Sequence, residues 1–437
     1  ERGTTQRERR PRVPETREGA TTGGGDIEVL STSGAITADS VDSTGGDAIF
    51  NAFTDLNLGS VIANGGQLQA GGNATLRAIT AANGFALVAL GNVTLGADTA
   101  AQITSSNLLA TGGSLSGCAC GSGGATLISL NGSVNVNLQS VTGVFDTIAA
   151  GISGDANVHV ATGDLGIGDL AGHNIAVTLP GGTLTVMNPV SSGGNYTLTA
   201  RDFGGNALLP TMGGGATKLN NVTITDTEGD LGAGGNLVAA GDIRVSSIGN
   251  ITGALSLSAD GDIDVTARAI RLGGVAGRDV VLNASTGGVD VVGTVTIGRN
   301  YTLTGTRFFG NALAVTGTRA GDLLVTDTAG DFDYTALDLG FAGSATLRAT
   351  GGAIRGGDIA TLGNLTLSAS GVSAGMLRSA QGGVDVESSA GADLSGVQAS
   401  NAIRVSAGGD LRLGSAELSG TGVNAFTLAA RGDLGFG

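Results

Sequence analysis

Three aspartates at alternate positions form the clearest set of potential metal ligands in the sequence. Asp260, Asp262 and Asp264 lie in the stretch ADGDIDV. Calcium-binding EF-hand loops also place carboxylates at alternate positions, but they need glycine at the sixth position and glutamate at the twelfth. Val265 and Arg271 occupy those two positions here. The aspartates are therefore candidate metal ligands in a pattern that favours solvated, outward-facing side chains, as does the second acidic stretch, GDFDYTALD. The sequence indicates no cofactor.

The histidines and cysteines do not form a catalytic or zinc-binding pattern. His159 alternates with valines in ANVHVATG, which points it outward on a strand, and His173 lies at an expected turn in AGHNIAV. Neither has a serine, cysteine or acidic partner at the spacing of a catalytic motif. Cys118 and Cys120 are too close for an unstrained disulfide, and two cysteines are too few for a tetrahedral zinc site. We therefore predict that the protein is not an enzyme.

The elements that must position these residues are built from small and aliphatic side chains. Of 437 residues, 80 are glycine, 41% are hydrophobic and 3% are aromatic, which suits thin, regular packing better than a core of large rings. No stretch approaches the roughly 18–20 consecutive apolar residues of a membrane helix. The net charge is −15; six arginines and four glutamates give +2 in residues 1–20 and leave −17 for the remainder. An acidic surface argues against nucleic acid as a partner.

A short repeat runs through most of the chain. GDIRV, which starts at Gly241, returns as GDIDV at Gly261; the apolar positions are kept, whereas Arg244 becomes Asp264. Similar stretches alternate apolar and polar residues over four to six positions, as in a strand with one buried face. Longer duplications also occur. NYTLTARDFGGNAL returns as NYTLTGTRFFGNAL 105 residues later, and TDTEGD returns as TDTAGD 101 residues later.

A period near twenty residues, with short strands and turns rich in glycine and asparagine, predicts an all-β fold, a parallel β-solenoid. Like positions of successive coils stack, so interior residues are constrained by their neighbours and outward residues vary. A β-propeller needs about 40 residues per blade and does not fit this period. We expect residues 24–437 to form the repeat domain and residues 1–23 to be an arginine-rich arm or linker.

Repeats such as GDIRVSS, GNVTLGA, GNLTLSA and GGDLRLGS resemble the repeat region of filamentous-haemagglutinin-like bacterial exoproteins. The resemblance implies a right-handed parallel β-helix that serves as the shaft of a surface adhesin and is exported through a partner pore in the outer membrane. Members of that family begin with a secretion domain carrying Asn-Pro-Asn motifs. Only the incomplete MNPV is present here, at mid-chain, so the resemblance is to the shaft and brings no catalytic residues.

The ends of the sequence suggest self-assembly. The repeat starts abruptly at GGGDIEVLS and stops at ARGDLGFG, without a helical or charged cap. Solenoids need such caps, so we expect either a piece of a longer chain or subunits that stack end to end. Before the repeat lies a segment without it, which is either a linker or an assembly arm that contacts the acidic flank or open strand edge of the next subunit. Its candidate contact residues are Arg7, Arg9, Arg10 and Arg12.

These observations predict a secreted structural protein of the bacterial cell surface that acts in adhesion or biofilm formation. It would be an adhesin shaft or a subunit of an extracellular fibre, with a host or cell-surface receptor as a possible partner. The alternative is a carbohydrate-active β-helix enzyme, a lyase or hydrolase. An enzyme of that kind would need three or more charged or aromatic side chains that converge in one groove.

Overall fold

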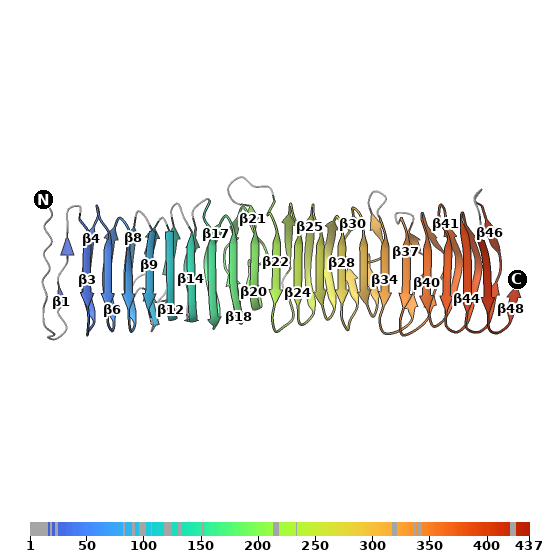
Figure 1. Ribbon diagram of the computed structural model, residues 1–437, viewed down its shortest axis with the longest axis horizontal. Helices are drawn as coiled ribbons and strands as arrows, with labels where there is room; N and C mark the ends of the chain where they lie inside the picture. Colours follow the sequence, from blue (N-terminus) through green and yellow to red (C-terminus); the bar gives the residue numbers. More distant parts are fainter. Residues whose placement is uncertain are drawn as a thin grey trace. The chain divides into compact units, whose positions relative to one another are not determined.

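The computed structural model describes residues 16–17, 20–21, 25–81, 84–89, 92–95, 102–105, 107–117, 125–129, 133–142, 144–150, 153–212, 218–232, 234–316, 321–335, 337–339, 343–419 and 425–437. These residues form strands and turns without any helix (Figure 1). They belong to two compact units, Glu1–Thr217 (unit 1) and Lys218–Gly437 (unit 2). The prediction of an all-β fold is confirmed.

Unit 1 is a stack of coils joined by parallel pairing. One series of paired strands comprises β3 (Ile27–Ser31), β5 (Ala48–Ala52), β7 (Gly66–Ala70), β9 (Gly84–Ala89), β12 (Asn107–Gly117), β14 (Val134–Thr142), β16 (Ala156–Thr162), β18 (Ile175–Val186) and β20 (Tyr196–Gly205). The other strands of its coils are β4 (Ile36–Ser43), β6 (Leu56–Ala63), β8 (Ala74–Ala81), β10 (Asn92–Leu95), β11 (Gln102–Ser105), β13 (Ala125–Ser129), β15 (Val144–Ala149), β17 (Leu165–Gly172), β19 (Ser191–Ser192) and β21 (Thr211–Met212).

Two short strands precede the first coil of unit 1. β1 (Thr16–Arg17) and β2 (Ala20–Thr21) both pair in parallel with β4, with Thr16 opposite Thr37 and Ala20 opposite Val41. Strand pairing therefore starts within residues 1–23, which we expected to be an arm or linker because they lack the repeat. Backbone hydrogen bonds to the edge of a sheet do not require the side-chain pattern of the repeat.

Unit 2 is built in the same way. Its longest series of parallel strands comprises β22 (Val222–Asp226), β24 (Ile243–Ser247), β26 (Ile263–Ala267), β28 (Val280–Ala284), β31 (Tyr301–Gly305), β34 (Leu323–Asp327), β37 (Ala345–Ala349), β40 (Leu365–Ala369), β42 (Val384–Ser388), β44 (Ala402–Ala407) and β47 (Ala425–Ala430).

The other strands of unit 2 form two further parallel sheets. The first contains β23 (Gly235–Ala239), β25 (Ile251–Ala259), β27 (Ile270–Gly277), β29 (Val289–Val291), β30 (Val295–Ile297), β32 (Phe308–Gly310) and β33 (Val315–Thr316). The second contains β35 (Phe332–Asp333), β36 (Leu337–Leu339), β38 (Ile354–Arg355), β39 (Ile359–Thr361), β41 (Val372–Ser379), β43 (Ala392–Ala399), β45 (Leu411–Leu413), β46 (Ala416–Leu418) and β48 (Leu434–Phe436).

The register of these pairs confirms a β-solenoid with about twenty residues per coil. Ile243 lies opposite Ile263, twenty residues later, and Ile263 lies opposite Val280, seventeen residues later. The widest step in this series is 23 residues, from Ile403 to Phe426. The strand positions stay aligned while the turns absorb the difference in length.

Alternation along each strand builds the core. In β24 the side chains of Ile243 and Val245 are buried, whereas Arg244 between them is exposed and lies opposite Asp264 of the next coil. The interior therefore consists of stacked columns of aliphatic side chains. This is why the repeat keeps its apolar positions and lets the polar position change.

A ladder of aspartate and asparagine side chains joins successive coils. Asn221 Oδ1 accepts the backbone N–H of Asp242 at 2.9 Å, and Asp242 Oδ1 accepts that of Asp262 at 3.0 Å. The same bond recurs in both units, here given as acceptor and donor: Asp26 and Asp47, Asp55 and Asn73, Asp155 and Asn174, Asn174 and Asn195, Asp230 and Asn250, Asp279 and Asn300, Asn300 and Asp322, Asn364 and Gly383, and Asp410 and Asp433.

Glycine precedes the donor residue at most steps of the ladder, where an added Cβ would meet the preceding coil; the exceptions are His173 before Asn174 and Arg299 before Asn300. A Cβ added to Gly261 would lie 2.5 Å from Asp242 Oδ1 and 2.6 Å from the carbonyl oxygen of Gly241. The ladder side chain of one coil thus fills the space that a Cβ of the next coil would need. This contact between coils favours the Gly-Asx pairs that recur in the repeat.

The longest duplication places one buried tyrosine in each unit. The Tyr196 hydroxyl donates to the carbonyl oxygen of Ala207 at 2.6 Å, and that of Tyr301 donates to Ala312 at 3.0 Å. Both rings are fully buried, and burial raises the pKa of both hydroxyls above the usual value. The two copies also share a glycine in the left-handed region, with φ of 60° at Gly205 and 59° at Gly310. The duplicated residues are therefore those that close the same corner of a coil.

Candidate functional site

The three aspartates proposed as metal ligands have separate surroundings in unit 2. Asp260 is exposed and accepts hydrogen bonds from Lys218 Nζ at 2.5 and 2.6 Å. Asp262 accepts one from Arg278 Nε at 2.9 Å, and Asp264 points outward from β26. Among the residues that the structure describes, no group of three or more His, Cys, Asp or Glu side chains could hold a metal ion.

The remaining residues singled out in the sequence do not form a site in the described residues. His159 is exposed on β16, as its alternation with valines predicts, and His173 lies at a bend after β17. Cys118 and Cys120 lie outside the described residues, and so do the arm residues Arg7, Arg9, Arg10 and Arg12.

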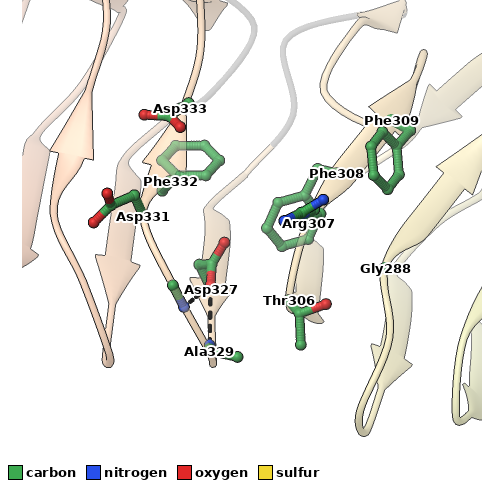
Figure 2. Close-up of a pocket in the computed structure, with 11 residues that line it drawn as sticks. Gly288, Thr306, Arg307, Phe308, Phe309, Asp327, Ala329, Asp331, Phe332 and Asp333 are labelled. Atoms are coloured by element: carbon green, nitrogen blue, oxygen red, sulfur yellow. Dashed lines mark hydrogen bonds between the residues drawn. The ribbon is translucent and has the colours of Figure 1, made fainter.

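A pocket in unit 2 brings charged and aromatic side chains together (Figure 2). It has a volume of about 940 Å³ and lies where the coil containing β31 and β32 meets the coil containing β34 and β35. The main lining side chains come from the stretches TRFF and DFD and from the end of β34: Arg307, Phe308, Phe309, Asp327, Phe332 and Asp333.

Aromatic rings form much of the pocket wall. The Phe308 and Phe332 rings meet edge to face, with centroids 5.8 Å apart, and the Tyr334 ring lies 5.8 Å from Phe332. Phe332 is buried, whereas Phe309 is 50% exposed. The Phe309 ring lies against Gly288, where its Cε2 atom would be 2.9 Å from an added Cβ. The Cδ2 and Cε2 atoms of this ring therefore lie beside the backbone of Gly288, and half of the residue's surface remains exposed.

The polar groups of the pocket carry both signs of charge. Arg307 is exposed, and so is Asp333, whose carboxylate has no hydrogen bond or ion pair to any described residue. Asp331 also lines the pocket, but Figure 2 shows its carboxylate turned away from Phe332, and it pairs with the guanidinium of Arg355. The pocket therefore offers both hydrogen-bond donors and acceptors.

Asp327 is the most buried carboxylate of the pocket, with 1% of its surface exposed. It is the last residue of β34, and its Oδ1 accepts the backbone N–H groups of Ala329 at 3.1 Å and Gly330 at 3.2 Å (Figure 2). Its Oδ2 has no hydrogen-bond partner among the residues that the structure describes. Among the described side chains, only Thr361 Oγ1 is fully enclosed without a hydrogen-bond partner. Asp327 Oδ2 therefore retains access to the pocket that Asp327 lines, and it can accept a ligand's donor.

Sequence reasoning missed this pocket, although two signals for it are present. By its sequence alone, the stretch GDFDYTALD favours a solvated acidic patch, and RFFG matches no known motif. RFFG lies inside one copy of the longest duplication, where TARDFGG becomes TGTRFFG. GDFDYTALD shares only its first two residues with the duplicated TDTAGD, and after them LGAG of the first copy is replaced by FDYT. Differences between copies of a structural motif mark positions that are free to acquire a site.

Charged and aromatic side chains line one pocket, as both a ligand-binding site and the enzyme alternative require. Their arrangement can hold a small polar molecule by hydrogen bonds and ring stacking.

The described part of the chain contains no helix with the length and apolar character of a membrane span. Comparisons of the chain with protein-family models, with curated proteins and with solved structures find no match.

Proposed function

We propose that this chain is a secreted structural protein of the bacterial surface, the shaft of a filamentous-haemagglutinin-like adhesin or the subunit of an extracellular fibre. Export through an outer-membrane partner, binding of a cell-surface receptor, end-to-end stacking, and a part in adhesion or biofilm formation belong to the same proposal. The β-solenoid is compatible with this function and with an enzyme alike, so the proposal depends on how the coils are joined.

The observation that carries the proposal is the ladder of Asp and Asn side chains. Ordinary parallel pairing joins coils through backbone bonds alone, whereas here a side-chain oxygen such as Asp242 Oδ1 adds a bond at the turn. Each such bond contributes about 0.5–1.5 kcal/mol. Because the bond recurs through both units, it resists the opening of one coil from the next, as a shaft under tension outside the cell requires.

Electron microscopy of the purified chain at several concentrations tests the structural role. We expect elongated particles that lengthen into filaments as concentration rises, and fewer filaments when residues 1–20 are deleted. A variant in which Arg7, Arg9, Arg10 and Arg12 are replaced by Gln separates the charge of this segment from its backbone pairing. Compact particles without any elongated form would refute the shaft.

A polysaccharide assay separates this proposal from the enzyme alternative. The chain is incubated with neutral and acidic polysaccharides, and new reducing ends and unsaturated products are measured. A structural protein gives neither product, while a hydrolase gives the first and a lyase gives both. Product formation that disappears in Asp327→Asn would favour the enzyme.

A further inference from the structure

We propose that the pocket of unit 2 binds a neutral carbohydrate, with Asp327 and Arg307 as hydrogen-bonding groups and Phe309 as the stacking surface. The inference deepens the proposed adhesive function and depends on it for its biological sense. Binding to the purified chain can nevertheless be measured whether or not that function is correct.

The first argument is a comparison of two equivalent aspartates within unit 2. Asp226 ends β22 as Asp327 ends β34, and both belong to the duplicated TDT-x-GD motif. In both cases Oδ1 accepts two backbone N–H groups of the following turn. Asp226 Oδ2 also accepts the hydroxyl of Ser247, its register partner on the next coil, at 2.9 Å.

The register partner of Asp327 is Ala349, which has no hydroxyl. Asp327 Oδ2 therefore lacks the donor that satisfies the other copy, and the pocket lies beside it. A ligand hydroxyl can supply the missing hydrogen bond. The comparison thus indicates an acceptor that the fold leaves for a ligand.

The second argument is charge. The exposed guanidinium of Arg307 disfavours a cationic ligand, and the carboxylates of Asp327 and Asp333 disfavour an anionic one. The third pocket carboxylate, Asp331, is neutralised by Arg355. A neutral molecule with many hydroxyl groups can use donors and acceptors at once, because each hydroxyl both donates and accepts.

The third argument is the Phe309 ring. It is half exposed and lies beside the backbone of Gly288, so a sugar ring can stack on its exposed surface. The axial C–H groups of a sugar ring form an apolar patch that packs against such a face. The pocket volume of about 940 Å³ lies within the roughly 300–1,000 Å³ of small-molecule sites.

Saturation-transfer NMR on the full chain tests the inference. The protein's aromatic protons are saturated in the presence of the methyl glycosides of glucose, galactose or mannose, with glucosamine as cationic and glucuronate as anionic comparison. We expect transfer to at least one neutral glycoside and an apparent affinity at least tenfold weaker in Phe309→Ala. Phe309→Trp retains a ring and should retain binding. Phe53→Ala removes a 63% exposed ring from unit 1 and is the matched control.

A second variant changes no side chain that would touch the sugar. Ala349→Ser supplies Asp327 with the hydroxyl that Ser247 gives Asp226, so it should weaken binding at least fivefold and leave the fold intact. Ala369→Ser adds the same hydroxyl at the equivalent position of β40 and should not change the affinity.

Three results would overturn the inference: no transfer to any neutral glycoside, equal affinity in Phe309→Ala and Phe53→Ala, or tighter binding of glucosamine or glucuronate. Failure of the filament experiment with sugar binding retained would reject the shaft and leave the pocket's ligand class in place. Filament formation without sugar binding would reject only the proposed ligand of the pocket.

Discussion

Replacing Gly321 by alanine tests the contact between ladder and glycine most directly. Gly321 precedes the ladder residue Asp322, whose backbone N–H donates to Asn300 Oδ1 at 2.9 Å. An added Cβ would collide with Asn300 Oδ1, and the next nearest atoms, both of Arg299, would be 3.4 Å away. The obstacle to alanine is therefore one side chain of the preceding coil, and that side chain can be removed independently.

The expected effect of Gly321→Ala on the free energy of unfolding has opposite signs in the natural sequence and in the Asn300→Ala variant. In the natural sequence, Gly321→Ala displaces the Asn300 side chain, with loss of a hydrogen bond of about 1 kcal/mol and rotamer strain of about 1 kcal/mol. Alanine also lowers the entropy of the unfolded chain, a gain of about 0.4–1 kcal/mol. The net change is a destabilisation of about 1 kcal/mol. In Asn300→Ala the collision is absent, so the same substitution should stabilise by about 0.5 kcal/mol.

Urea unfolding followed by circular dichroism, on the four chains of this double-mutant cycle, measures the coupling. We expect a coupling free energy of about 1.5 kcal/mol between the two positions. Independent sites add to within about 0.5 kcal/mol, so additivity within that limit would refute the steric explanation of the Gly-Asx pair. Amide exchange at Asp322 gives a local check, since its protection should fall in both single variants.

Three further predictions concern buried and paired groups. Tyr301→Phe leaves the carbonyl of Ala312 without its donor and should destabilise the chain by about 1 kcal/mol in urea unfolding. Because burial raises the pKa of Tyr196 and Tyr301, their stabilisation is complete below pH 10 and decreases above it. Phenolate absorbance from these rings should therefore appear only with unfolding. Arg299 lowers the pKa of Asp279 chiefly through a side-chain hydrogen bond. That stabilisation is present above about pH 4 and disappears on acidification, so Arg299→Gln should move acid unfolding, followed by circular dichroism, to higher pH.

The coil could be predicted from the sequence because its causes are local and repeated. Alternation of apolar and polar residues determines which side chains are buried, and the twenty-residue period aligns them, as at Ile243 and Ile263. The ladder could not be predicted, although its residues recur throughout the repeat. Asparagine and glycine favour turns by themselves, so a contact between two coils could not be separated from local turn preference without the structure.

The pocket was harder to predict because it depends on residues that are far apart in the repeat pattern. Arg307 and Asp327 belong to different coils, and they meet only when the turn lengths between them are known. The absence of a hydroxyl at Ala349 becomes informative only beside the pair of Asp226 and Ser247. A single sequence shows each of these residues but not which of them are neighbours.

The ladder also bears on how such a gene can change its length. At each Gly-Asx step, the Asx side chain binds the next coil, and the glycine leaves space for the Asx side chain of the preceding coil. An in-frame deletion or duplication between two such steps therefore restores equivalent neighbours at the junction. Unequal recombination between repeats would then yield chains that fold at once, without compensating substitutions. The two copies of the tyrosine motif, 105 residues apart, are the expected trace of such an event, and their difference at RFFG shows that duplicated segments can diverge while both keep the buried tyrosine.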